Sequence, residues 1–228
     1  MPRRCTSVRS TRQRAVRRAL LAALLGAAAT SPTRGAEPPA IAAVLLQPRT
    51  ALGVGGSVAL AYKPLVLFEG GRYSADPATA LAPAPRLAGR WQRDGSSFVF
   101  TPDAGSSFTV QARLQARAAP ADGRWQGRFR SLGGVGAPGQ GTAVVAVAKT
   151  LHFSADGTLR SDSTAGSSTD APGALATSSR SSAATRYTLA GHVLTLALPD
   201  GSTRTQLFYR FPDSDRVIGV GGGTYSAR

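Results

Sequence analysis

The sequence predicts an all-β fold: an antiparallel sandwich or barrel-like sheet built from a duplicated hairpin unit. After Ser57 no stretch has the period of a long amphipathic helix, and short β-rich runs alternate with Gly, Pro and Asp-Gly pairs. Two hairpin patterns also match at an offset of 96 residues. We expect either two related antiparallel sheets or one continuous barrel-like sheet, and the sequence leaves both open.

The stretch from residue 186 to residue 211 gives the clearest hairpin signal. Asp200-Gly201 is typical of a primed two-residue turn, which would pair residues whose numbers sum to 401. That register would place one largely apolar set of side chains on a single face: His192, Leu194, Leu196, Leu198, Thr203, Thr205, Leu207, Tyr209 and Phe211.

A second hairpin is predicted over residues 96–117, where residues 108–117 alternate apolar and polar side chains as one strand. At the offset of 96, Arg90-Trp91 matches Arg186-Tyr187 and Gly95 matches Gly191. Four of the ten aspartates directly precede a glycine, so most carboxylates are expected to make turns: Asp94, Asp122, Asp156 and Asp200.

These motifs resemble a known group of proteins. The pattern Φ-x-F-x-x-D-G at residues 151–157, the pattern R-Y-x-L-x-G-x-x-L-x-L-x-x-x-D-G at residues 186–201 and the final IGVGGGTY are similar to secreted bacterial proteins with repeated lipocalin-like β modules. Gly89 and Gly123 fit the glycine that begins a G-x-W unit in such modules, and Thr185 departs from it. The resemblance covers about residues 60–228 and implies a β fold without implying an activity.

The N-terminal residues have the three parts of a secretory signal peptide, predicted over residues 1–29 with cleavage after Ala29. A basic segment precedes an apolar run too short to span a bilayer, and Ala27-Ala28-Ala29 supplies the small residues of a cleavage site. Residues 1–36 hold eight arginines and no acidic residue, which leaves 19 basic and 12 acidic residues after them. We therefore expect export to the periplasm or medium, no transmembrane helix in the mature chain and no nucleic-acid partner.

The rest of the chain divides into a tether and two β modules. Residues 30–56, rich in Pro, Ala and Gly, are expected to form the tether. The first module is predicted over residues 57–118 and the second over 119–228, packed together as one domain. Within the second, residues 161–185 are rich in Ser and Thr and are predicted to be a disordered loop.

Few residues suggest chemistry. The only cysteine, Cys5, lies in the signal segment, so the mature chain has no thiol. The glycines at 134, 136 and 139 lack the strand and helix that a dinucleotide site needs, and no cofactor or metal is expected. His152 and His192 could share a metal only if folding brought them together. The ligand-binding candidates are the aromatic residues Trp91, Trp125, Tyr187 and Tyr209, together with His192.

Three functions stay open at this point. We expect an exported, non-enzymatic β-rich protein that binds an unidentified ligand or partner of the cell envelope. One alternative is a hydrolase or metal-dependent enzyme whose residues converge only in three dimensions, and another is a purely structural or interaction protein. Arginines on predicted outward faces would attract anionic polymers or lipid head groups, namely Arg113, Arg117, Arg204 and Arg210. The sequence does not indicate the oligomeric state.

Overall fold

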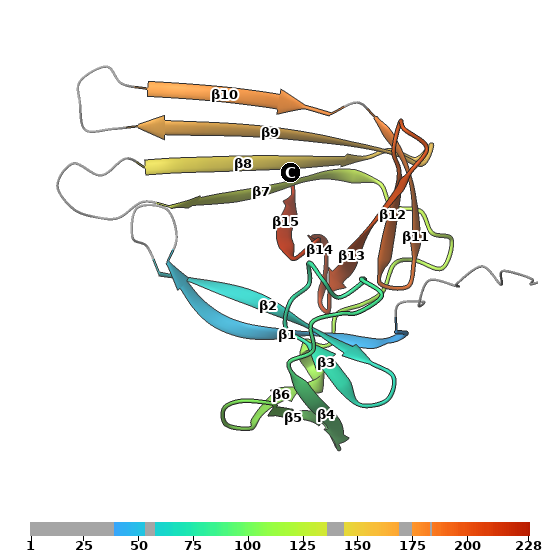
Figure 1. The fold of residues 1–228 in the computed structure, drawn as a ribbon. Helices are drawn as coiled ribbons and strands as arrows, with labels where there is room; N and C mark the ends of the chain where they lie inside the picture. Colours follow the sequence, from blue (N-terminus) through green and yellow to red (C-terminus); the bar gives the residue numbers. More distant parts are fainter. Residues whose placement is uncertain (1–38, 53–57, 136–143, 169–174, 183) are drawn as a thin grey trace, which may run out of the picture. The chain divides into compact units, whose positions relative to one another are not determined.

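The computed structural model describes residues 39–52, 58–135, 144–168, 175–182 and 184–228 (Figure 1). These residues belong to one compact unit, residues 36–228. They form antiparallel strands and a single short 3-10 helix, η2 (Ala112–Leu114), which confirms the all-β prediction. Within the described part of the chain, no helix has the length and apolar character needed to cross a membrane. The predicted signal peptide and Ala29 lie outside the described residues.

The first sheet has six strands in sequence order. They are β1 (Ile41–Leu52), β2 (Val58–Phe68), β3 (Arg72–Ser74), β4 (Gly89–Asp94), β5 (Ser97–Pro102) and β6 (Phe108–Gln111). The predicted strand over residues 108–117 is therefore too long, because it ends at Gln111 and turns through η2. This turn brings the chain back to β1, where Leu45 and Gln115 form an antiparallel bridge.

The assignment of residues 30–56 to a tether is wrong for residues 41–52, which form β1. Val44, Leu45 and Leu46 are fully buried. Leu45 packs in the core of the first sheet, whereas Val44 and Leu46 pack in a different cluster on the opposite face. A strand buried on both faces has a continuous apolar run, so it shows no alternation in the sequence.

The second sheet has nine strands and closes on itself (Figure 1). They are β7 (Gly127–Val135), β8 (Val144–Phe153), β9 (Thr158–Ser168), β10 (Leu175–Ser181), β11 (Thr185–Ala190), β12 (Val193–Ala197), β13 (Thr203–Phe211), β14 (Ser214–Val220) and β15 (Gly223–Ala227). Because β9 pairs with β8 and β15 pairs with β7, eight of these strands form a barrel-like ring and β10 adds to the edge of β9.

The prediction of a disordered loop over residues 161–185 is wrong for most of that segment. Residues 161–168 belong to β9 and residues 175–181 form β10, while residues 169–174 and 183 lie outside the described residues. Seven consecutive residue pairs join β9 to β10. Serine and threonine side chains contribute little to an apolar core. These residues form strands nevertheless, because main-chain hydrogen bonds to the neighbouring strand pair their backbone N–H and C=O groups.

The register predicted around Asp200-Gly201 is wrong by one residue. Val193 lies opposite Leu207, so paired residue numbers sum to 400 rather than 401. The connection spans three residues, since Gly201 N–H donates to the Leu198 carbonyl at 3.0 Å. As a result Leu194 shares a face with Phe208, while Leu207 and Tyr209 point to the opposite face.

The prediction that aspartates before glycine make turns is confirmed. The glycines that follow Asp94, Asp122, Asp156 and Asp200 all have positive φ, between 54° and 81°. At three of these turns the aspartate Oδ1 accepts the N–H of the residue two positions on: Arg124, Thr158 and Ser202.

The pairing registers of the two meanders agree with the offset of 96. Trp91 lies opposite Phe100 as Tyr187 lies opposite Leu196, and Ser97 lies opposite Gln111 as Val193 lies opposite Leu207. The origin of the two meanders in one duplicated unit stays a prediction.

A third core joins the two sheets. Val44, Leu46, Val66 and Phe68 of the first sheet pack with Leu207 and Tyr209 of the second. Arg117, in the segment between the two sheets, pairs with Arg210 of β13 next to this core. The two residues exchange main-chain hydrogen bonds, and their guanidinium groups donate to the Asp215 carboxylate, at 2.7 Å from Arg117 and 3.2 Å from Arg210. Arg117 and Arg210 are therefore structural contacts rather than a free basic surface.

Candidate functional site

Aromatic side chains pack together in the described interior of the second sheet. Phe129, Phe153, Tyr187, Phe208 and Tyr225 belong to one buried cluster. Trp125 packs against this cluster, with ring centroids 6.1 Å from Phe129 and 6.2 Å from Phe208. The side chains predicted to line a ligand cavity here are therefore packed against one another.

Trp125 and Tyr187 hold each other in place. The Tyr187 hydroxyl donates to the Trp125 carbonyl at 2.6 Å and accepts the Trp125 N–H at 3.1 Å. The Arg210 guanidinium lies 5.5 Å from the centre of the Trp125 ring. These contacts fix the entry of the chain into β7, which is a structural task.

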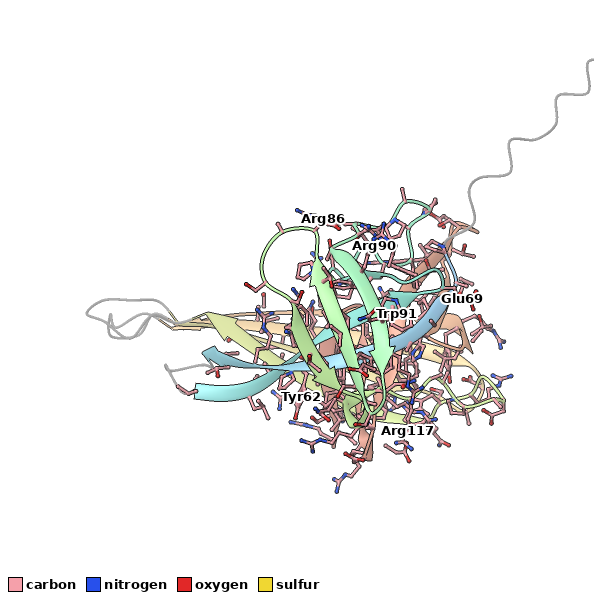
Figure 2. All side chains as sticks on the ribbon, turned by 90° about the horizontal axis from the view of Figure 1, so that it is seen from below. Tyr62, Glu69, Arg86, Arg90, Trp91 and Arg117 are labelled. Carbon is pink, nitrogen blue, oxygen red and sulfur yellow. The ribbon has the colours of Figure 1, made fainter. Side chains whose placement is uncertain are left out.

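The other two aromatic candidates lie in different cores. Trp91 lies on β4 (Figure 2), packs against the core of the first sheet, and donates its indole N–H to the Phe68 carbonyl at 3.2 Å. Tyr209 is fully buried between the sheets, and burial raises the pKa of its hydroxyl to about 12. The structure thus does not bring the four aromatic candidates to one site.

The two histidines occupy different environments. His192 is half-buried, its Nδ1 lies 3.2 Å from the Phe208 carbonyl, and burial lowers its pKa below the ordinary 6.5. It lines a cavity of about 330 Å³ together with Ile41 and Leu81. His152 is exposed on β8. No group of three or more His, Cys, Asp or Glu residues in the described part of the chain could hold a metal ion.

A cavity formed by described residues lies on the outer face of β11, β12 and β13. It has a volume of about 660 Å³, within the size range of small-molecule sites. One wall is the turn at residues 121–124, and the floor is the sheet. We name it the arginine–threonine cleft after five of its residues: Arg124, Arg186, Thr188, Thr195 and Thr203.

Strand alternation places the threonines in the floor of this cleft. Tyr187 and Leu189 are buried in the interior, so Arg186 and Thr188 between them point outward. Thr188 lies opposite Thr195, and Ala197 lies opposite both Arg186 and Thr203. The hydroxyls and Arg186 therefore form two adjacent rows across three strands.

Two Asp-Gly turns position the arginines. Asp122 accepts the backbone N–H of Arg124 at 3.0 Å, and the Arg124 guanidinium lies directly over Gly157, where any side chain would displace it. Arg186 donates to the carbonyl of Asp156 at 3.3 Å. The turns at Gly123 and Gly157 therefore place the Arg124 and Arg186 guanidinium groups next to the turn that precedes β9.

The carboxylates near the cleft are already engaged by other donors. Thr158 donates its hydroxyl to Asp156 at 2.7 Å and its N–H at 2.9 Å, and these bonds, with Arg186 as a smaller contribution, lower the pKa of Asp156. Among the described residues, neither Arg124 nor Arg186 forms a salt bridge. Two guanidinium groups and a row of hydroxyl donors therefore face an open cleft, which suits an oxyanion.

Sequence reasoning missed this site. Arg124, Gly157 and Arg186 are far apart in the chain. They meet only because β9 begins at Thr158, directly after the turn that contains Gly157, and because residues 119–123 run along the open edge of β11. The signal available in the sequence was the pair of Asp-Gly turns: Arg124 directly follows Asp122-Gly123, and in the fold Arg186 contacts the turn at Asp156-Gly157. Comparison with protein-family models, with curated proteins and with solved structures gave no match.

Proposed function

We propose that this chain is an exported, non-enzymatic β-rich protein that binds an anionic ligand of the cell envelope in the arginine–threonine cleft. The observation that supports this most strongly is that Arg124 and Arg186 face the cleft without a carboxylate partner among the described residues. The ligand class follows from the donors, since guanidinium groups pair with phosphate, sulfate or carboxylate oxygens in a fixed, two-pronged geometry.

The threonines make the site suited to a hydroxylated or ester-linked anion. Thr188 and Thr203 are exposed, so their hydroxyls can donate to or accept from a ligand without breaking a core contact. The cleft is open to solvent, and exposed charges are screened by salt, so we expect modest affinity that falls as ionic strength rises.

Export is the second part of the proposal. It is supported by the basic start of the chain, the short apolar run and the small residues at 27–29. The barrel-like ring of the second sheet is also the kind of architecture that the resemblance to lipocalin-like modules implies. N-terminal sequencing of the protein from the periplasm or medium tests export, and an intact Met1 in that product would overturn it.

A titration calorimetry experiment tests the ligand class. We expect glucose 1-phosphate to bind and glucose not to bind, because only the phosphate offers an oxyanion. In the double variant Arg124→Gln, Arg186→Gln we expect binding to weaken about tenfold or more, since each hydrogen bond to a charged group contributes about 1.5–3 kcal/mol. The matched control is Arg90→Gln, Arg113→Gln, which removes the same charge from exposed positions on β4 and η2.

Two results would overturn the proposed site. Equal binding of glucose and glucose 1-phosphate would show that charge does not select the ligand. An equal loss of affinity in the cleft variant and the control variant would show that only net charge matters.

One observation favours a second candidate, a purely structural or interaction protein. Phe153 packs 6.1 Å from Phe129 and 5.2 Å from Tyr187 inside the second sheet, so the protein's own side chains occupy this part of the interior. Absence of glucose 1-phosphate binding in the titration above would favour this candidate over the first.

A further inference from the structure

We infer that the anion is a linear polymer with repeating negative charges, which runs from the arginine–threonine cleft across the outer face of β9, β8 and β7. This inference rests on the proposed function, because it extends the same site. It comes from four basic side chains that lie opposite one another on neighbouring strands: Arg228, Arg128, His152 and Arg160. We call these four the basic row.

The pairing registers define the basic row. His152 lies opposite Arg128 on β7 and opposite Arg160 on β9. Arg228 follows β15 and donates its N–H to the Arg128 carbonyl at 3.1 Å, which extends the row by one position. Directly opposed residues of antiparallel strands share a face, and the neighbours Phe129, Leu151 and Leu159 are buried inside. The four basic side chains therefore point outward, and all four are exposed.

The row lacks enough carboxylate to neutralise it. Arg160 forms an ion pair with Asp162 at 3.3 Å, and Asp162 also attracts Arg128. Asp162 in turn accepts a hydrogen bond from Ser181 at 2.6 Å. No other ion pair involving the basic row occurs among the described residues. Arg228 and Arg128 carry like charges on adjacent backbone positions, which destabilises a sheet, and a bound polyanion would remove that repulsion.

The basic row and the cleft form one surface. Arg186, in the cleft, lies opposite Thr158 on β9, and Thr158 is two residues from Arg160 on the same face. Residues at diagonal positions on paired strands, such as Arg186 and Arg160, have backbones about 7–8 Å apart. A chain that leaves the cleft at Arg186 therefore meets Arg160 next, without crossing a strand that lacks a cation.

The extent of this surface favours a polymer over a small ion. The basic row crosses four neighbouring strands, which at about 4.8 Å per strand spacing covers roughly 14 Å before the cleft is added. A single phosphate group contacts only the donors immediately around it. A polymer engages successive cations at once, and each further contact then forms at high effective concentration.

The side chains on this face also favour a soluble polymer over a membrane surface as the binding partner. The described outer face of β7, β8 and β9 has one exposed large apolar side chain, Leu132, and isolated ones are ordinary at protein surfaces. No Phe, Tyr or Trp side chain lies within the basic row, so it lacks the large aromatic platform on which successive nucleic-acid bases stack. A flexible anionic chain such as a phosphate polymer or an acidic polysaccharide fits these features.

Calorimetric titration of the exported protein with long-chain polyphosphate and with tripolyphosphate tests the inference. We expect the long chain to bind at least about tenfold more tightly per molecule, and to lose affinity more steeply as salt is added. In the double variant Arg128→Gln, Arg160→Gln we expect the long-chain advantage to disappear while tripolyphosphate binds as before. The variant Arg90→Gln, Arg113→Gln is the charge-matched control, and circular dichroism checks that each variant is folded.

The outcomes separate this inference from the proposed function. If the row variant binds the long chain as tightly as the unmodified protein does, the polymer inference is wrong and the cleft proposal stands. If the cleft variant Arg124→Gln, Arg186→Gln binds both probes normally, the cleft proposal itself fails. Binding to anionic lipid vesicles without binding to free polyphosphate would overturn the inference in favour of a membrane surface. Should the row variant not fold, equal salt dependence of long and short probes on the unmodified protein would overturn it.

Discussion

Replacing Gly219 with alanine should destabilise the protein strongly, because the ring of Tyr209 occupies the space where a side chain would start. Tyr209 and Gly219 lie directly opposite each other on β13 and β14. A Cβ atom at position 219 would overlap three carbon atoms of the Tyr209 ring, well inside the 3.5–4.0 Å of an ordinary carbon contact. No positive φ is involved at Gly219, so the cost of the substitution is steric.

The magnitude follows from where Tyr209 would have to go. The ring is fully buried in the core that joins the two sheets, packed with Val44, Leu46 and Phe68. Overpacking a well-packed core costs about 1–3 kcal/mol, and complete loss of a buried aromatic ring costs about 3–5 kcal/mol. We expect Gly219→Ala to cost about 3 kcal/mol, or roughly a 10 °C lower melting temperature for a chain of this size.

Urea denaturation, with the two tryptophans as probe, measures this cost. The matched control is Gly133→Ala in β7, where an added Cβ meets nothing and φ is not positive; it should keep or slightly raise stability. In a Tyr209→Ala background, Gly219→Ala should cost little more, because the clash has gone. Equal stability of Gly219→Ala and the unmodified protein would refute the packing of the two sheets through Tyr209.

Three further outcomes are expected. Tyr187→Phe should cost about 1–3 kcal/mol in urea denaturation, because it leaves the part-buried N–H and carbonyl of Trp125 without the hydroxyl that pairs with both; an unchanged midpoint would contradict that pairing. Gly201→Val should cost about 1–3 kcal/mol in thermal melting, from positive φ alone, since nothing lies near its Cβ; a loss as small as that of Ser202→Val would contradict the turn. The neutral form of His192 stabilises the fold because its folded pKa lies below the ordinary 6.5, so stability should fall as pH drops below 6.5, and His192→Gln should lessen that fall; parallel pH profiles of the two proteins would count against this burial.

Local turn chemistry was the most predictable part of this fold. An aspartate before a glycine specifies its own backbone, and all four such pairs form turns with positive φ at glycine. The register around Gly201 was not predictable in the same way. Leu207 and Phe208 are adjacent and both fully buried, because β13 contacts the barrel interior on one face and the first sheet on the other. Alternation of apolar and polar residues cannot fix the register of a strand that is buried on both faces.

The candidate site depended on information that no single stretch contains. Trp91, Trp125, Tyr187 and Tyr209 were reasonable ligand-binding candidates by residue type, yet each packs in a core. Large aromatic side chains are the ones that fill protein cores, so residue type alone does not separate a core position from a ligand-binding one.

The basic surface shows the same limit. Arg117 and Arg210 were expected to be free, but they bind Asp215 and main-chain carbonyls next to the inter-sheet core. Arg124 and Arg186 come together only through the turn at Gly157, which joins two strands that are separated in the sequence from both arginines. Their meeting is a consequence of tertiary structure.

Amide chemical shifts recorded during titration with polyphosphate test the central claim most directly, because they locate the bound anion on the molecule. We predict that the largest shifts occur at Gly123, Gly157 and Arg186, continue to His152 and Arg128, and spare the first sheet. Shifts centred on the cavity beside His192, or spread evenly over every exposed arginine, would contradict the account.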